Sequence, residues 1–157
     1  MTDGSLLARL KGIVGSEHLV THERQLATYA SDGLLQYAVM PVAVVLPGTA
    51  EEVAAVVRAC HEAGTAWVAR GAGSGLSGGA LPVEEGVLIA LSRLRRILEV
   101  DIPNGRVLVE PGVTNIAVSQ AVAPTHFFPP DPSSQVVCSI GGNVAENSGG
   151  AHCYKYG

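Results

Sequence analysis

Apolar residues recur at helical and strand spacings along the first half of the chain. Residues 5–12 and 22–30 have the pattern of two short helices. Residues 41–47 form an apolar run with a proline at each end, which indicates a buried strand. A second short apolar run over residues 66–69 predicts another strand.

A helix is expected between these two strands. Val53, Val56 and Cys60 recur at helical spacing, and Gly64 ends the run. Thr49 with Glu52 three residues later predicts a capping box at its start. Strand, helix and strand within so short a stretch predict a βαβ unit whose two strands are parallel.

The pattern changes in the second half. Residues 86–91 predict a further strand, and residues 97–101 and 106–110 predict a hairpin closed by Pro103-Asn104-Gly105, because Asn-Gly favours tight hairpin turns. Residues 114–123 predict a helix that Pro124 ends. The elements together predict an α+β fold with a βαβ unit near the N-terminus.

Composition fits one globular domain over residues 1–157, because 47% of the residues are hydrophobic and 15% are charged. The net charge of −4 gives no electrostatic reason to expect nucleic acid or an anionic membrane as a partner. No apolar run is long enough for a membrane helix. The three cysteines, Cys60, Cys138 and Cys153, lack metal-type spacing and are interpreted as reduced thiols. With no basic signal-like start, the chain is expected in the cytoplasm, without a metal site.

Five of the 19 glycines fall within residues 71–79, directly after a predicted strand. Gly73, Gly75 and Gly78 match the dinucleotide fingerprint G-x-G-x-x-G, but Pro82 and Gly86 exclude the helix that this fingerprint requires. A glycine nest can hold a phosphate without a helix, because successive N–H groups converge on the anion. The alternative is a tight connection between strands. The candidate phosphate-binding residues are Arg70, Gly71, Ala72, Gly73, Ser74, Gly75, Leu76, Ser77, Gly78 and Gly79.

A second glycine cluster, residues 139–150, follows a proline-rich stretch over 127–134. Ile140, Val144 and Ala145 predict that this cluster is partly buried. A buried segment so rich in polar groups needs partners for its backbone. It would therefore suit the polar edge of a flat ligand, and the alternative is a solvent-exposed loop.

The order of RGAGSGLSGGA, VEPGVTN, PPDPSS and SIGGNVAENSGGAHCYKYG resembles the FAD-binding subunit of bacterial glycolate oxidase. Flavin-linked D-lactate and D-2-hydroxyglutarate dehydrogenases share the pattern, and the class has an FAD domain of the vanillyl-alcohol-oxidase type. The resemblance runs from about residue 20 to the last residue. It implies that the chain is the N-terminal part of such a domain, incomplete at its C-terminus.

The resemblance also implies which residues contact FAD. Residues 70–79 would wrap the pyrophosphate. The residues expected beside the flavin are Pro111, Gly112, Val113, Pro130, Asp131, Ser133 and Ser134. Those expected at the pyrophosphate and isoalloxazine are Gly141, Gly142, Asn143, Ala145, Asn147, Gly149 and Gly150. Some members of the superfamily attach flavin covalently through a histidine in the first loop. Ser74 stands at that place here, so non-covalent FAD is expected.

The implied activity is oxidation of a small-molecule 2-hydroxy acid, of the glycolate or D-lactate type, by hydride transfer to flavin. In the family the substrate residues come from a later cap domain, so the catalytic residues are not identified in this chain, which is expected to be inactive alone. His152 is interpreted as a flavin-side or a structural residue. Other subunits of a glycolate oxidase complex are implied partners. The alternatives are a flavin domain of the same fold serving another reaction, such as the reductase of cell-wall precursor synthesis, or a non-catalytic fragment without bound cofactor.

Overall fold

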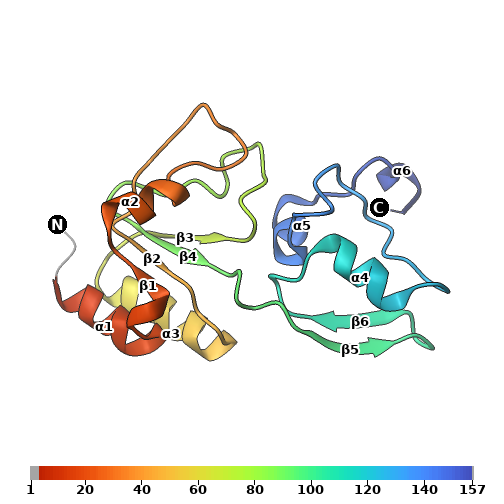
Figure 1. Cartoon of the computed structure of the whole chain (residues 1–157), viewed down its shortest axis with the longest axis horizontal. Coiled ribbons are helices and arrows are strands. Elements are labelled where there is room, and N and C mark those ends of the chain that lie inside the picture. The colour runs from red at the N-terminus through yellow and green to blue at the C-terminus, as the bar shows by residue number, and fades with distance from the viewer. Residues whose placement is uncertain (1–3, 157) are drawn as a thin grey trace. The chain divides into compact units, whose positions relative to one another are not determined.

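The structure is a computed structural model that describes residues 4–156, shown in Figure 1. The chain divides into two compact units, residues 1–93 (unit 1) and residues 94–157 (unit 2). Each unit is described by itself. The assignment of residues 1–157 to one domain stays a prediction, since a domain can contain two such units.

Unit 1 is a four-stranded sheet with helices on both faces. Its elements are α1 (Gly4–Val14), β1 (Leu19–Val20), α2 (Glu23–Leu26), β2 (Ala43–Val45), α3 (Ala50–Glu62), β3 (Trp67–Arg70) and β4 (Val87–Ala90), with 3-10 turns at Ser16–His18 and Ala27–Tyr29. The strand order is β1-β2-β4-β3, with β2, β4 and β3 parallel and β1 antiparallel to β2. The helix that the sequence predicts over residues 22–30 is divided into α2 and the 3-10 turn at Ala27–Tyr29.

The predicted parallel strands of the βαβ unit, β2 and β3, are confirmed, but β4 lies between them. Every residue of β4 is buried, whereas Trp67 of β3 is 42% exposed. The most apolar strand therefore occupies the centre of the sheet, and the strand that carries a half-exposed tryptophan takes the edge.

The sheet buries both of its faces because successive side chains of a strand point in opposite directions. Val45, Val87 and Ile89 pack into one cluster with residues of α1 and α3. Val44, Leu88 and Ala90 form a second cluster with Leu26 of α2. Figure 1 shows α1 and α3 on one side of the sheet and α2 on the other.

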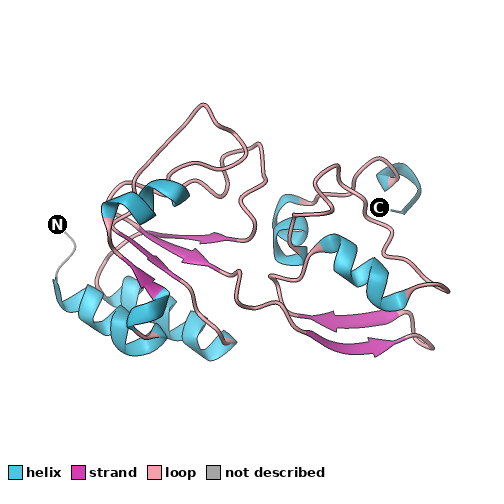
Figure 2. Cartoon of the chain, in the orientation of Figure 1, coloured by secondary structure: helices cyan, strands magenta, loops and turns pink. Residues whose placement is uncertain are grey.

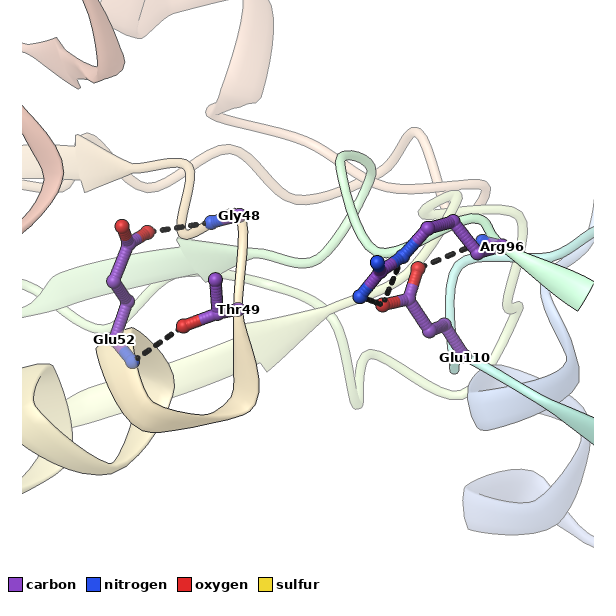
Figure 3. A network of polar contacts seen from close by, with 5 residues as sticks. All are labelled: Gly48, Thr49, Glu52, Arg96 and Glu110. Carbon is purple, nitrogen blue, oxygen red and sulfur yellow. Dashed lines mark hydrogen bonds and ion pairs between the residues drawn. The ribbon is translucent and has the colours of Figure 1, made fainter. Parts of the chain in front are cut away.

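The N-terminus of α3 is capped nearly as the sequence predicts (Figure 3). Thr49 Oγ1 accepts a hydrogen bond from the Glu52 backbone N–H at 3.1 Å. The Glu52 carboxylate accepts from the Gly48 N–H at 2.6 Å, one residue before the position that the capping box predicts. The first bond satisfies a donor that the first helical turn would otherwise leave unpaired, and the second fixes the backbone just before the cap.

Unit 2 consists of the hairpin β5 (Ile97–Asp101) and β6 (Arg106–Val109), followed by the helices α4 (Asn115–Val122), α5 (Ile140–Glu146) and α6 (Cys153–Tyr156), as Figure 2 shows. The hairpin is confirmed, and because Asp101 pairs with Arg106 its turn spans residues 102–105, which include the predicted Pro103-Asn104-Gly105. The Asp101 carboxylate accepts hydrogen bonds from both Asn104 and Arg106, and these bonds stabilise the turn. The buried apolar residues of unit 2 are Leu94, Val113, Val118, Val122 and Cys138.

Residues 140–146 of the second glycine cluster form the helix α5, an element that the sequence pattern did not predict. Ser139 caps α5 through its Oγ, which accepts from the Gly142 N–H at 3.3 Å, and Asn147 ends the helix at φ 54°. Val144 is 78% exposed and Ala145 is also exposed, so the predicted burial of these two residues is wrong. Ile140 is half-buried and Asn143 is buried. The helix thus buries the polar Asn143 while the apolar Val144 and Ala145 are exposed.

Between residues 4 and 156, no helix combines the length and the apolar character that crossing a membrane requires. Unit 2 contains a cavity of about 220 Å³ between the hairpin, α4 and residues 126–129. None of the side chains that line this cavity belongs to the residues predicted to contact a cofactor.

Candidate functional site

In unit 1 the glycine loop, residues 71–79, begins where β3 ends at Arg70. The Arg70 side chain is buried, and its guanidinium donates to the backbone carbonyls of Tyr29, at 2.7 Å, and Ser31. Burial lowers the pKa of this guanidinium from its ordinary value, while the charge of Asp32 acts in the opposite direction. Arg70 therefore fastens the start of the loop to residues 29–32.

Gly33 and Gly73 bring the same two stretches into direct contact. The Gly33 N–H donates to the Gly73 carbonyl at 2.7 Å. A Cβ on Gly33 would lie 2.7 Å from the Gly75 carbonyl oxygen, and a Cβ on Gly73 would lie 2.5 Å from the Arg70 Nε. Gly73 also has φ 69°, in the left-handed region that favours glycine. The loop is thus held close to residues 31–33 by contacts that leave no room for a side chain at either glycine.

Asp32 is a buried carboxylate beside this loop that sequence reasoning missed. One oxygen, Oδ1, accepts from the Leu34 N–H at 2.8 Å. The other, Oδ2, is buried and has no hydrogen-bond partner in the structure. The only signal in the sequence is the turn-like composition of Ser31-Asp32-Gly33, which does not reveal that a carboxylate is buried there.

The remainder of the loop is open to solvent at its outer positions. Ala72, Leu76, Ser77 and Gly79 are exposed, and Gly71, Ser74, Gly75 and Gly78 are half-buried. No helix begins between residues 79 and 86, which confirms that the Rossmann fingerprint does not apply. The loop offers backbone N–H groups on glycines and two serine hydroxyls, which are donors suited to an anion.

In unit 2 an ion pair precedes the Pro111-Gly112-Val113 turn (Figure 3). The Glu110 carboxylate accepts from Arg96 at three points: the backbone N–H at 2.7 Å, Nε at 3.0 Å and Nη2 at 2.7 Å. These bonds hold the pKa of Glu110 below its ordinary value. The Gly112 N–H donates to the Leu94 carbonyl at 2.6 Å, so the turn is fixed at both ends.

The start of α5 packs directly on this turn. The Gly141 N–H donates to the Pro111 carbonyl and the Ile140 N–H to the Val113 carbonyl, both at 2.8 Å. A Cβ on Gly141 would lie 2.7 Å from the Pro111 Cβ, so only glycine permits this approach. The structure therefore brings the predicted residues Pro111, Gly112, Val113, Gly141 and Gly142 together.

The Pro130–Ser134 segment joins the same group through two contacts. Asn115, which is fully buried at the start of α4, donates from Nδ2 to the Pro130 carbonyl at 2.8 Å. The Asp131 N–H donates to the Gly149 carbonyl at 3.1 Å, and Asp131 forms a backbone bridge with Gly150. Asn115 carries no signal of this role in the sequence beyond its place in the VEPGVTN motif.

Two buried amides of unit 2 have an unsatisfied atom. Asn143 Nδ2 on α5 and Asn115 Oδ1 on α4 lack a hydrogen-bond partner. A buried donor without a partner is costly, and a ligand with acceptor atoms would satisfy it. Asn143 is one of the residues that the sequence predicts at the cofactor, so the residues present fit a polar, acceptor-rich group such as FAD.

Some predicted residues lie apart from these contacts. Ala145, Asn147 and Ser133 are exposed, and Ser134 is half-buried, where its carbonyl accepts from Val137 and Cys138. His152 pairs with Asp131, which spacing along the chain does not reveal. Across the described part of the chain, residues 4–156, no three His, Cys, Asp or Glu side chains gather in a way that could hold a metal ion.

Comparison with known proteins gives a family and several relatives. The sequence profile described as FAD binding domain matches residues 41–157. The chain is 51% identical over 153 residues to glycolate oxidase subunit GlcD of Escherichia coli strain K12, covering 97% of this chain and 30% of that protein. It is 35% identical over 158 residues to D-2-hydroxyglutarate dehydrogenase of Xanthomonas citri pv. viticola, covering 100% of this chain and 33% of that protein. The chain thus spans about a third of the length of these curated relatives.

Solved structures identify the fold. Alkyldihydroxyacetonephosphate synthase matches with a TM-score of 0.88 and 24% identity, covering 100% of this chain and 34% of that chain. p-Cresol methylhydroxylase matches with a TM-score of 0.76 and 24% identity, covering 89% of this chain and 28% of that chain. These likenesses confirm the predicted α+β fold of the vanillyl-alcohol-oxidase type.

Proposed function

Because the chain belongs to the FAD binding domain family, we propose that it is the FAD-binding part of an oxidoreductase that oxidises a 2-hydroxy acid of the glycolate or D-lactate type. Membership makes FAD the cofactor. The substrate class rests on relatives named as glycolate oxidase subunit and D-2-hydroxyglutarate dehydrogenase, of which this chain spans about a third.

The observation that carries the proposal is the convergence in unit 2 of three segments that the sequence assigns to the cofactor. Residues 111–113, 130–134 and 141–150 are far enough apart along the chain that nothing local requires them to meet, yet backbone hydrogen bonds join them. The buried Asn143 Nδ2 beside them lacks an acceptor. The cofactor contacts of these residues are the proposal that this convergence supports.

Each unit has its own proposed task. In unit 1 the loop from Arg70 to Gly79 binds the pyrophosphate through backbone N–H groups and the hydroxyls of Ser74 and Ser77. Arg70 takes part by fastening the loop, since its guanidinium already donates to the carbonyls of Tyr29 and Ser31. In unit 2 residues 111–113 and 130–134 lie beside the flavin. Residues 141–150 contact the pyrophosphate and isoalloxazine, with Asn143 as a donor. Bound FAD would supply the hydride acceptor for oxidation at the α-carbon of the substrate.

The contribution of the described residues to the reaction is to bind and position the cofactor. Backbone donors held by close glycine contacts are preorganised, so they bind the cofactor without a further loss of conformational freedom. The acceptor of the substrate's hydroxyl proton has no candidate assigned among the described residues. We place the protein in the cytoplasm. Because the GlcD relative is named as a subunit of glycolate oxidase, we also propose that this protein assembles with other subunits.

The experiment is a spectrum followed by a substrate panel. The protein, purified from its complete coding sequence, should show the visible absorption of oxidised flavin. Anaerobic mixing with glycolate, D-lactate or D-2-hydroxyglutarate should bleach that absorption, and L-lactate should bleach it far more slowly. A protein without flavin would refute the cofactor assignment. A flavoprotein that no 2-hydroxy acid bleaches would refute the substrate class alone.

The same preparation tests the mode of attachment. Ser74 has no side chain able to form the histidyl–flavin bond of some superfamily members, so we propose non-covalent FAD. Precipitation with acid should leave all the flavin in the supernatant. Flavin retained in the washed pellet would contradict non-covalent binding.

A further inference from the structure

Asp131 and His152 form a two-point contact in unit 2. The imidazole Nδ1 of His152 lies 2.6 Å from Asp131 Oδ2, and the backbone N–H of His152 donates to Asp131 Oδ1 at 3.2 Å. One residue thus occupies both oxygens of the carboxylate. Hydrogen bonds from His152 lower the pKa of Asp131 below its ordinary value, so the carboxylate is ionised near neutral pH.

The tautomer of His152 follows from this geometry. An ionised carboxylate only accepts hydrogen bonds, so Nδ1 must carry a proton. In neutral His152 the other ring nitrogen, Nε2, is then unprotonated. The side chain is 66% exposed, and none of residues 4–156 forms a hydrogen bond with Nε2.

The backbone around the pair is held just as closely. Asp131 bridges Gly150, and its N–H donates to the Gly149 carbonyl. Gly150 has φ 83°, and a Cβ there would collide with the Asp131 backbone. The aromatic rings of Phe127 and Tyr156 make an edge-to-face contact 6.0 Å apart between the same two stretches of chain. Residues 127–131 and 149–156 are therefore joined at several points, and the Asp131–His152 pair is the charged one.

We propose that His152 is a positioning residue of the flavin site: by holding the Asp131 carboxylate it keeps residues 130–134 against residues 149–152. This inference rests on the proposed function, in which both stretches contact the flavin end of FAD. It gives Asp131 a task different from direct contact through its carboxylate, because both carboxylate oxygens are already bound by His152. The cofactor would instead meet backbone groups that the pair holds in place.

Three substitutions at one position separate this role from the alternatives. His152→Ala removes the side-chain bond. His152→Asn restores a donor, because the amide nitrogen of asparagine can occupy the place of Nδ1. His152→Gln places its amide near the position of Nε2 instead. FAD binding to each cofactor-free protein, prepared from the complete coding sequence, is measured by isothermal titration calorimetry.

We expect His152→Ala to weaken FAD binding about tenfold, the equivalent of about 1.4 kcal/mol and the scale of one charge-assisted hydrogen bond. His152→Asn should stay within about threefold of wild type, and His152→Gln should resemble His152→Ala. Asp131→Asn should cause a similar loss, and adding His152→Ala to it should cost little more, because the two residues act as one pair. His126→Ala is the matched control, since His126 is an exposed histidine of unit 2 that contacts Thr125.

A second readout needs no flavin. The ¹⁵N shifts of the His152 ring in the cofactor-free protein should show the Nδ1–H tautomer, and Asp131→Asn should abolish this preference. An Nε2–H tautomer, rescue by glutamine instead of asparagine, or an unchanged FAD affinity in His152→Ala would each overturn the inference alone. A wild-type protein that binds no FAD would overturn the proposed function, and this inference with it.

Discussion

Gly73 combines a left-handed backbone with a contact to the Arg70 guanidinium, and both exclude a side chain. Gly73→Ala should lower the free energy of unfolding by about 1–3 kcal/mol, from the left-handed conformation and the lost space together. It should also abolish FAD binding, since the loop would move away from residue 33. Urea unfolding and calorimetric titration with FAD measure the two effects.

The matched control for Gly73 is Gly12, which lies in α1 with no atom near its missing Cβ. Gly12→Ala should stabilise the protein by about 0.5–1 kcal/mol, since alanine favours the helix, and it should leave FAD binding unchanged. Equal effects of the two substitutions on stability and on FAD binding would contradict a specific requirement for glycine at position 73.

Arg70 stabilises the start of the same loop through hydrogen bonds to the carbonyl groups of Tyr29 and Ser31. Arg70→Met should destabilise the protein by about 2–4 kcal/mol, because it leaves two carbonyl acceptors and the Asp32 charge without their buried partner. Arg58→Met, on the exposed face of α3, should change stability by less than about 0.5 kcal/mol. Chemical denaturation distinguishes the two. A small effect at Arg70 would mean that water replaces the guanidinium.

At this scale the sequence shows which residues stand at the loop but not what each one contacts. Glycine spacing identifies Gly73, since glycine has few other reasons to cluster. Gly33 and Asp32 lie some forty positions earlier, and Arg70 reaches Tyr29 across a separation of 41. Contacts of that kind depend on the tertiary fold, which no local pattern encodes.

At the scale of elements, the Arg96–Glu110 pair joins β5 to the end of β6. Glu110 has a pKa below its ordinary value of 4.5, so its stabilising contribution is present above about pH 4.5 and is lost as the pH falls through its lower, folded-state pKa. Glu110→Gln should therefore lower the Tm at pH 7, and the difference from wild type should shrink below about pH 4.5.

Thermal unfolding followed by circular dichroism across pH 3–8 measures this difference. Glu99→Gln, an exposed glutamate on β5, is the control and should show a smaller difference at every pH. A Glu110→Gln difference that stays constant down to pH 3 would contradict a role for the ionised carboxylate.

Helix α5 shows where prediction of an element fails. Gly141 and Gly142 lower the helix propensity of residues 140–146, and polar residues surround them. The helix forms because Ser139 caps it and because Pro111 and Val113 accept its first N–H groups. By contrast α3 and β4 could be predicted, since their apolar periodicity is local. Tertiary hydrogen bonds overrode propensity in α5.

At the scale of the whole molecule, the two units differ in how much apolar surface they bury. Both core clusters consist of residues from unit 1. Unit 2 buries only five apolar side chains among its described residues and exposes Leu98, Leu108, Val136, Val137 and Val144. A chain of about 60 residues is marginally stable even with a good core.

Residues 1–93 expressed alone should therefore fold, with cooperative unfolding in urea. Residues 94–157 expressed alone should show no cooperative transition. Circular dichroism against urea concentration tests both fragments under identical conditions. A cooperative transition in the second fragment, or none in the first, would contradict this assignment of stability.

Trp67 gives the chain a built-in optical probe, because it is the one tryptophan in the sequence and lies on β3, three residues before Arg70. Its half-exposed ring reports on unit 1, whereas two of the four tyrosines lie in unit 2. Oxidised flavin absorbs where tryptophan emits, so a cofactor bound at the neighbouring loop would quench the indole emission by resonance energy transfer. Arrival of FAD could then be timed in the unlabelled protein, with a signal that arises at the strand from which the loop begins.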